Sequence, residues 1–130
     1  MNIHDALALH QAGHLDQAKN AYLKLLEEQP DNVDALQLLA AISLQTKHYQ
    51  RVLDLTDQVF ELNPVHTQAH FNRGVALAGL KRYTEAIRHL KMAVNNGMVT
   101  ADAFYNVAQC HQHIDPLATS DRLLLTTYLR

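Results

Sequence analysis

The stretch LKRYTEAIRHLKMAV, residues 80–94, decides the fold because the chain has already carried a version of it. The earlier version is TKHYQRVLDLTDQVF, residues 46–60, which begins 34 positions before it. Several residues that stay in register over such a period indicate a tandem repeat of one supersecondary unit. The matching pairs are Lys47 and Lys81, Tyr49 and Tyr83, Val52 and Ala86, and Val59 and Ala93.

The same spacing extends over the whole chain, which we expect to form a single domain over residues 1–130. The repeat units are approximately 1–32, 33–66, 67–100 and 101–130. In each unit, apolar residues recur every three to four positions in two successive runs, so each unit predicts two helices. The predicted helices, about eight in all, span residues 2–12, 15–28, 33–46, 49–62, 67–80, 83–95, 101–113 and 117–129.

Composition and charge exclude several classes of function. The 130 residues are 48% hydrophobic and 18% charged, which is typical of a globular protein. A formal net charge of −2 provides no field that would attract DNA, RNA or an anionic membrane surface. The single cysteine, Cys110, favours a reducing compartment, and the first residues contain no basic leader followed by an apolar run. We therefore expect a cytoplasmic protein.

The third and first units carry the clearest repeat signatures. The third reads FNRGVALAGLKRYTEAIRHLKMAV, residues 71–94, with small residues at Gly74, Ala86 and Ala93. The first reads AGHLDQAKNAYLKLLEEQP, residues 12–30. These units resemble the tetratricopeptide repeat, whose pattern is a small-residue pair in the first helix, an aromatic residue and an Ala in the second, and then Pro.

The resemblance implies an all-α fold, a right-handed superhelical solenoid of antiparallel helix pairs. In that family the first helix of each pair lines a concave groove, which usually holds a peptide or helix of a partner protein. Stacked pairs share a continuous core and leave such an extended surface, because one pair cannot bury its apolar faces alone. The leading hypothesis is therefore a protein–protein interaction module without catalysis of its own.

Two repeat pairs bear on what the groove would bind. Asn72 and Asn106 lie 34 positions apart. Their resemblance to the Asn ladders of peptide O-linked glycosyltransferase arrays implies that their amides project into the groove and hold a peptide backbone, as donor and acceptor. The alternative is that they are solvated or structural residues, as Asn at this place often is in the family. Phe71 and Tyr105 are either an apolar platform for a ligand or packing between first helices. The candidate groove residues are Asn72, Asn106, Phe71, Tyr105, Gln37, Gln68 and Gln109.

The family's two-carboxylate clamp, which grips an acidic C-terminal tail through Lys, Asn and Arg, is not reproduced in this sequence. Only Asn72 agrees with it, and the carboxylate of Asp102 would repel a ligand carboxylate. We therefore predict that the chain does not bind acidic chaperone tails by that clamp. The matching positions are Gln37, Ala41, Asn72, Asp102 and Asn106.

The histidines and the known catalytic motifs do not predict a reaction. His10 with His14, and His66 with His70, have the i,i+4 spacing that can hold a metal on a helix. However, Gly13 is expected to end the first helix between one pair, and His66 is expected to lie in a loop. No hydrolytic, zinc-protease or phosphate-loop motif occurs. We expect no catalytic residue, no metal and no cofactor.

Three functions remain open at this stage. The first is the interaction module. The second is the N-terminal array of a larger enzyme, because the opening units resemble arrays that precede bacterial glycosyltransferase domains. The third is a self-assembling protein that forms a homodimer through the last helix, since repeat arrays usually end in a polar capping helix and this one is apolar. The candidate self-association residues are Leu117, Leu124, Leu125 and Tyr128.

Overall fold

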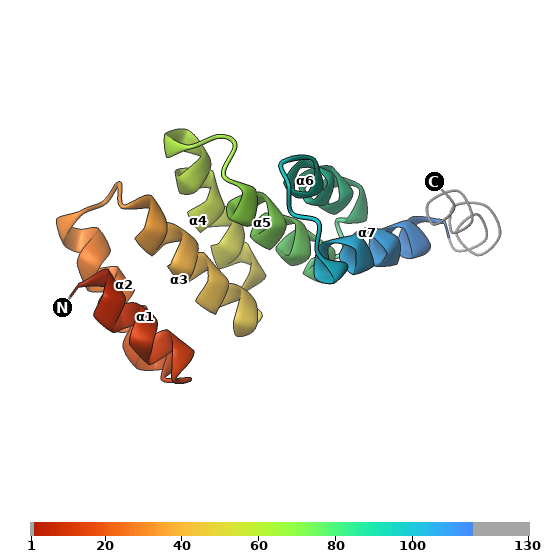
Figure 1. Cartoon of the computed structure of the whole chain (residues 1–130). Coiled ribbons are helices and arrows are strands. Elements are labelled where there is room, and N and C mark those ends of the chain that lie inside the picture. Colours follow the sequence, from red (N-terminus) through yellow and green to blue (C-terminus); the bar gives the residue numbers. More distant parts are fainter. Residues whose placement is uncertain (1, 116–130) are drawn as a thin grey trace.

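Seven helices form most of residues 2–115, the part of the chain that the computed structural model describes. Figure 1 shows them as a succession of antiparallel pairs along an elongated array. Every predicted helix boundary in this part lies within one residue of the observed one, and the eighth predicted helix, 117–129, lies outside the described residues. The helices are α1 (Ile3–Gln11), α2 (Leu15–Glu28), α3 (Val33–Gln45), α4 (Tyr49–Leu62), α5 (Thr67–Gly79), α6 (Tyr83–Asn95) and α7 (Ala101–Ile114).

The first helix of each pair begins at a side-chain cap. Asn2, Asn32 and Thr100 each accept a hydrogen bond from the backbone N–H three residues further on. His66 does the same for α5, through Nδ1. Each bond satisfies an N–H group that has no partner inside its own helix. The local sequence therefore specifies where the first helices begin.

A residue of positive φ turns the chain from the first helix of each pair to the second. These residues are Gly13 (φ 86°), Lys47 (φ 62°) and Lys81 (φ 64°), which are one repeat period apart. In each turn, the N–H of the next residue donates to the carbonyl five residues before it, which closes the helix in a Schellman motif. Gly97 (φ 106°) ends α6 in the same way.

The pairs stack around two buried clusters that follow each other along the array. The first lies among α1 to α5 and includes Tyr22 and Leu36; the second lies among α4 to α7 and includes Leu77 and Leu90. Small residues such as Ala86 are fully buried and let the helices approach closely. The predicted all-α solenoid of antiparallel helix pairs is confirmed.

Candidate functional site

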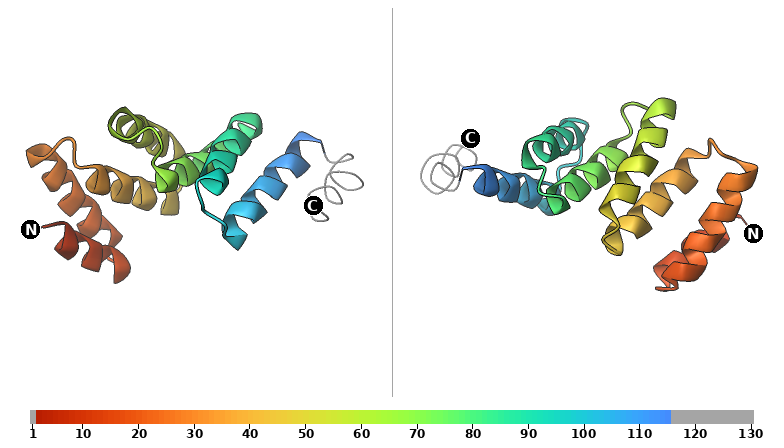
Figure 2. Two further views of the ribbon diagram at one scale, coloured as in Figure 1. Left: turned by 45° about the horizontal axis from the view of Figure 1, so that its top comes forward. Right: turned by 180° about the vertical axis from the view of Figure 1, so that it is seen from behind.

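The first helices α1, α3, α5 and α7 form a continuous row in which each contacts the next. Figure 2 shows the array from two further sides, with α1 and α7 at opposite ends. All seven candidate groove residues lie on α3, α5 or α7. We call the surface that they mark the first-helix face; it carries Gln37, Gln68, Phe71, Asn72, Tyr105, Asn106 and Gln109.

Asn72 lies beneath the first-helix face and not on its surface. It is only 3% exposed, and its Oδ1 accepts a hydrogen bond from Gln68 Nε2 at 3.1 Å. Its Nδ2 is also buried and has no hydrogen-bond partner within residues 2–115. The amide therefore does not project onto the surface as predicted: it is buried, and Gln68, one turn earlier on α5, is hydrogen-bonded to its Oδ1.

Asn106 and Gln109 line a pocket of about 270 Å³ between α5 and α7. Asn106 Nδ2 donates to the backbone carbonyl of Asp102, one turn earlier on its own helix, at 2.7 Å. Tyr49 and Tyr83, from the starts of α4 and α6, complete the walls and were not among the predicted site residues. The recurrence of Tyr at one repeat period is the sequence signal that identifies them.

The two aromatic candidates differ in their surroundings. Phe71 is half-buried and packs against the second cluster, so packing accounts for its presence. Tyr105, its equivalent one period later, is 62% exposed. Gln37 is half-buried and Gln68 is exposed. The structure therefore leaves the ring of Tyr105, and not that of Phe71, accessible to a ligand.

The charge on the first helices is negative. Arg73 is the one Lys or Arg within α1, α3, α5 and α7. Its guanidinium turns to α4, where it donates to the Leu53 carbonyl and to Thr56 Oγ1, both at 2.9 Å, and pairs with the Asp57 carboxylate at 2.8 Å. The first helices thus carry three carboxylates, and their one Lys or Arg side chain is already paired. These carboxylates are Asp5, Asp34 and Asp102.

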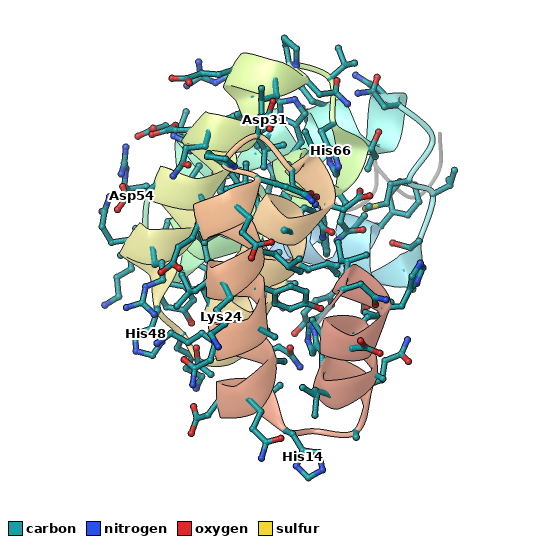
Figure 3. All side chains as sticks on the ribbon, turned by 90° about the vertical axis from the view of Figure 1, so that its left-hand side faces the viewer. His14, Lys24, Asp31, His48, Asp54 and His66 are labelled. Atoms are coloured by element: carbon teal, nitrogen blue, oxygen red, sulfur yellow. The ribbon has the colours of Figure 1, made fainter. Side chains whose placement is uncertain are left out.

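Neither of the two histidine pairs is arranged as a pair of metal ligands on one helix. Figure 3 shows His14 at the turn between α1 and α2 and His66 at the opposite edge of the array. Because α1 ends at Gln11, His14 lies beyond the helix that carries His10, as predicted. His66 caps α5, and His70 is bonded to the backbone carbonyl of Pro64. Within residues 2–115, no group of three or more His, Cys, Asp or Glu is placed to hold a metal ion.

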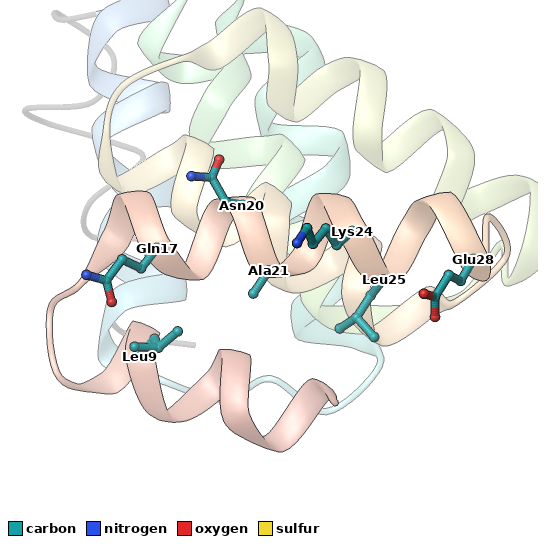
Figure 4. A pocket seen from close by; sticks show the side chains of 7 residues that line it. All are labelled: Leu9, Gln17, Asn20, Ala21, Lys24, Leu25 and Glu28. Carbon is teal, nitrogen blue, oxygen red and sulfur yellow. The ribbon is translucent and has the colours of Figure 1, made fainter. Parts of the chain in front are cut away.

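A second pocket, of about 480 Å³, lies between α1 and α2 at the other end of the array. In Figure 4, Leu9 points from α1 toward α2, and Ala21 and Leu25 point from α2 toward α1. The charged side chains of Lys24 and Glu28 also line it. It exists because α1 has 9 residues and α2 has 14, so α1 covers only part of its partner. The sequence analysis did not identify this pocket, although the short first helix is visible in the sequence.

The last predicted helix, Cys110 and membrane spanning remain to be considered. The apolar residues of the last predicted helix, Leu117, Leu124, Leu125 and Tyr128, lie outside residues 2–115. Cys110 lies on α7 and is only 1% exposed. This burial raises the pKa of its thiol. None of the helices in the described part of the chain is both long and apolar enough to cross a membrane.

Comparison with known proteins links the chain to several longer proteins. The family model of the anaphase-promoting complex, cyclosome, subunit 3 matches residues 11–93. The TPR repeat-containing protein YvcD of Bacillus subtilis is 26% identical over 105 residues, which are 81% of this chain and 22% of that protein. The protein O-mannosyl-transferase TMTC3 of Homo sapiens is 31% identical over 94 residues, 69% of this chain and 10% of that protein. The chain therefore spans only a small part of the length of these relatives.

Solved structures share the fold. A structure of MamA superposes with a TM-score of 0.74 at 27% identity, over 86% of this chain and 66% of that one. The first TPR domain of Spaghetti (RPAP3), solved with an HSP90 peptide, superposes with a TM-score of 0.80 at 19% identity, over 85% of this chain and 88% of that one. With the 34-residue period and the recurring turns, these matches show that the chain is a tetratricopeptide-repeat protein and belongs to the family described by the subunit 3 model of the anaphase-promoting complex.

Proposed function

We propose that the first-helix face binds an extended, neutral or basic segment of a partner protein, and that the chain acts as an interaction module without catalysis. The observation that carries this proposal is the charge. The first helices offer carboxylates and carboxamides, while their one guanidinium, Arg73, is held by α4. An acidic ligand would be repelled, whereas a peptide backbone would meet carboxamides that both donate and accept. The RPAP3 domain, which holds a peptide on the same fold, supports the peptide-binding part of this proposal and not the charge preference.

Asn72 supports the proposal because its unpaired buried amide lowers stability and the fold does not need it. A buried donor without a partner costs about 1–3 kcal/mol of stability. Leu38 stands at the equivalent position one repeat earlier, so this fold accepts an apolar side chain there. Gln68 is exposed, and if its carboxamide turned outward on binding, the side chain of Asn72 would lose this bond and be free to turn its Nδ2 to a peptide carbonyl. A bound backbone would then supply the missing acceptor.

Replacing Asn72 with Leu is therefore expected to raise stability and to weaken binding. Removing the unpaired amide should raise the free energy of unfolding by about 1 kcal/mol, measured by urea denaturation. The same variant should bind selected peptides less tightly than the original chain. A variant that is less stable than the original chain would show that the amide serves the fold and not a ligand.

The function itself is tested by selecting peptides from a displayed random library against the 130-residue chain. We expect a consensus, and we expect the enriched peptides to bind the Asn72→Ala, Asn106→Ala double variant more weakly by about 1–3 kcal/mol. Circular dichroism should first show that both proteins are folded.

The peptide SRMEEVD, an acidic tail, serves as the negative control and should not bind measurably. Failure to enrich any sequence, or tight binding of the acidic tail, would contradict the proposal.

A second function is favoured by the similarity to TMTC3, a transferase much longer than this chain. In that case the array would hold a protein substrate for a transferase domain elsewhere on a longer chain. Reading the gene on both sides of this segment tests the idea, since it requires a transferase domain in the same reading frame.

A further inference from the structure

The pocket between α5 and α7 is small for a ligand-binding site. Its volume of about 270 Å³ is below the roughly 300–1,000 Å³ of typical small-molecule sites. Val75, Ala78 and Gly79 of α5 contribute only small side chains to it, or none. Tyr49 and Tyr83 contribute aromatic rings. The α5 side of the pocket is therefore mostly apolar, and the small volume favours a peptide side chain over a larger ligand.

Both tyrosine rings are fixed by their neighbours before any ligand binds. The ring of Tyr49 lies against Gly79, where an added Cβ atom would be 2.5 Å from Cζ of the ring. The ring of Tyr83 stacks on His113 of α7, with ring centroids 4.5 Å apart and planes within 3° of parallel. A pocket with fixed walls loses little conformational entropy when it is filled.

The polarity of the lining limits what can enter. Among the described residues that line the pocket there is no Lys, Arg, Asp or Glu. A Lys or Arg side chain would therefore lose part of its hydration there without gaining a carboxylate partner. The carboxamides of Asn106 and Gln109 stand at the α7 side and match the donors and acceptors of a peptide unit. This combination suits an apolar side chain whose backbone lies along α7.

The carboxylate of Asp102 lies on the same side of α7 as Asn106 and Gln109, beyond the pocket. Asp102, Asn106, Gln109 and His113 are spaced by four, three and four residues, so they share one side of the helix. Asp102 is exposed and lies about 10 Å along the helix axis from Gln109, at roughly 1.5 Å per residue. An extended peptide covers that distance in about three residues. A basic residue three positions from the pocket residue would therefore reach Asp102.

We propose that the pocket selects a large apolar side chain, such as Leu, Met or Phe, of the bound peptide, and that Asp102 selects Lys or Arg three positions away from it. This inference rests on the peptide-binding function proposed above and names the class of sequence that the face recognises. The partner is therefore a protein with an accessible segment that carries an apolar and a basic residue at this spacing.

The test repeats the library selection with three further variants of the 130-residue chain. Ala78→Leu fills the pocket, and the fold accepts it because Leu44 stands at the equivalent position one repeat earlier. Asp102→Asn removes the charge and keeps the size of an exposed side chain. Ala8→Leu adds the same side chain as the first variant at an exposed position on α1 and is the matched control.

The original chain and Ala8→Leu should enrich an apolar and a basic residue three positions apart. Ala78→Leu should lose the preference for Leu over Ala at the apolar position by about tenfold or more, and keep the basic preference. Asp102→Asn should lose the preference for a basic residue and keep the preference for an apolar residue. If the enriched peptides show no preference for an apolar residue, or if Ala78→Leu keeps that preference, the pocket assignment is overturned and the binding function stands. A selection without any consensus overturns both.

Discussion

Replacing Gly74 with Val should reduce the free energy of unfolding by about 3 kcal/mol, the upper end of the cost of overpacking a core. At this position a Cβ atom alone would lie 2.6 Å from Leu90 Cγ and 3.2 Å from the Ala86 carbonyl oxygen. Leu90 is fully buried and cannot turn away, and the carbonyl belongs to the backbone of α6. Helices α5 and α6 would have to separate. Urea denaturation followed by circular dichroism measures the loss.

The second repeat unit supplies the control for this prediction. It carries Ala40 where the third unit has Gly74, and the smaller Thr56 where the third unit has Leu90. Both are fully buried, so that unit accommodates a methyl group at the same place. We expect Gly74→Ala and Leu90→Thr to be less destabilising together than the sum of the two single changes, by about 1 kcal/mol. Strict additivity would show that the two side chains do not compete for space.

Acidification from pH 7 to pH 4.5 is expected to destabilise the chain through a histidine pair between α5 and α6. His70 is 3% exposed, and its Nε2 donates to the carbonyl oxygen of Pro64 at 2.9 Å. Its Nδ1 is then the acceptor for the Nδ1–H of His89, at 3.1 Å. The ring of Phe60 stacks on His70 with centroids 4.3 Å apart. Burial, and secondly the nearby charge of Arg73, lower the pKa of His89 to about 4.

The direction of the pH effect follows from that pKa. The unfolded chain protonates His89 near pH 6.5, whereas the folded chain does so only near pH 4. Stability is therefore fully present above pH 6.5 and is lost as the pH falls toward 4. The pKa difference corresponds to about 3 kcal/mol, which solvent screening at this half-buried ring reduces to about 1–2 kcal/mol. Arg88 opposes protonation and Glu85 favours it, both more weakly than burial.

Thermal unfolding at a series of pH values tests this prediction with two variants. The double variant His70→Leu, His89→Leu copies the second unit, where Leu36 and Leu55 stand at the equivalent positions. It should show a clearly smaller loss of stability between pH 6.5 and pH 4.5. His14→Gln, a change at an exposed turn, should keep the original pH dependence. A double variant as acid-sensitive as the original chain would contradict the role of the pair.

Much of the candidate site was predictable from the sequence, but its details were not. The spacing of Asn106 and Gln109, three positions apart, predicts that they share one side of α7, and both line the pocket there. The repeat period also predicted Asn72 on the groove side of α5, but the sequence does not show that its side chain is buried and bonded to Gln68. Tyr49 belongs to the pocket only because α4 and α5 meet at a particular angle, which brings its ring onto Gly79.

The sequence by itself determined the helices, their ends and their pairing. The cap at Asn32 and the turns at Lys47 and Lys81 depend on residues no more than five positions apart, so local chemistry is sufficient to specify them. Only the tertiary structure decided which side chains meet between helices. It directed Arg73 to Asp57, which removes the one cation from the first helices. Such contacts join residues far apart in the chain, and they depend on how each helix packs against the next.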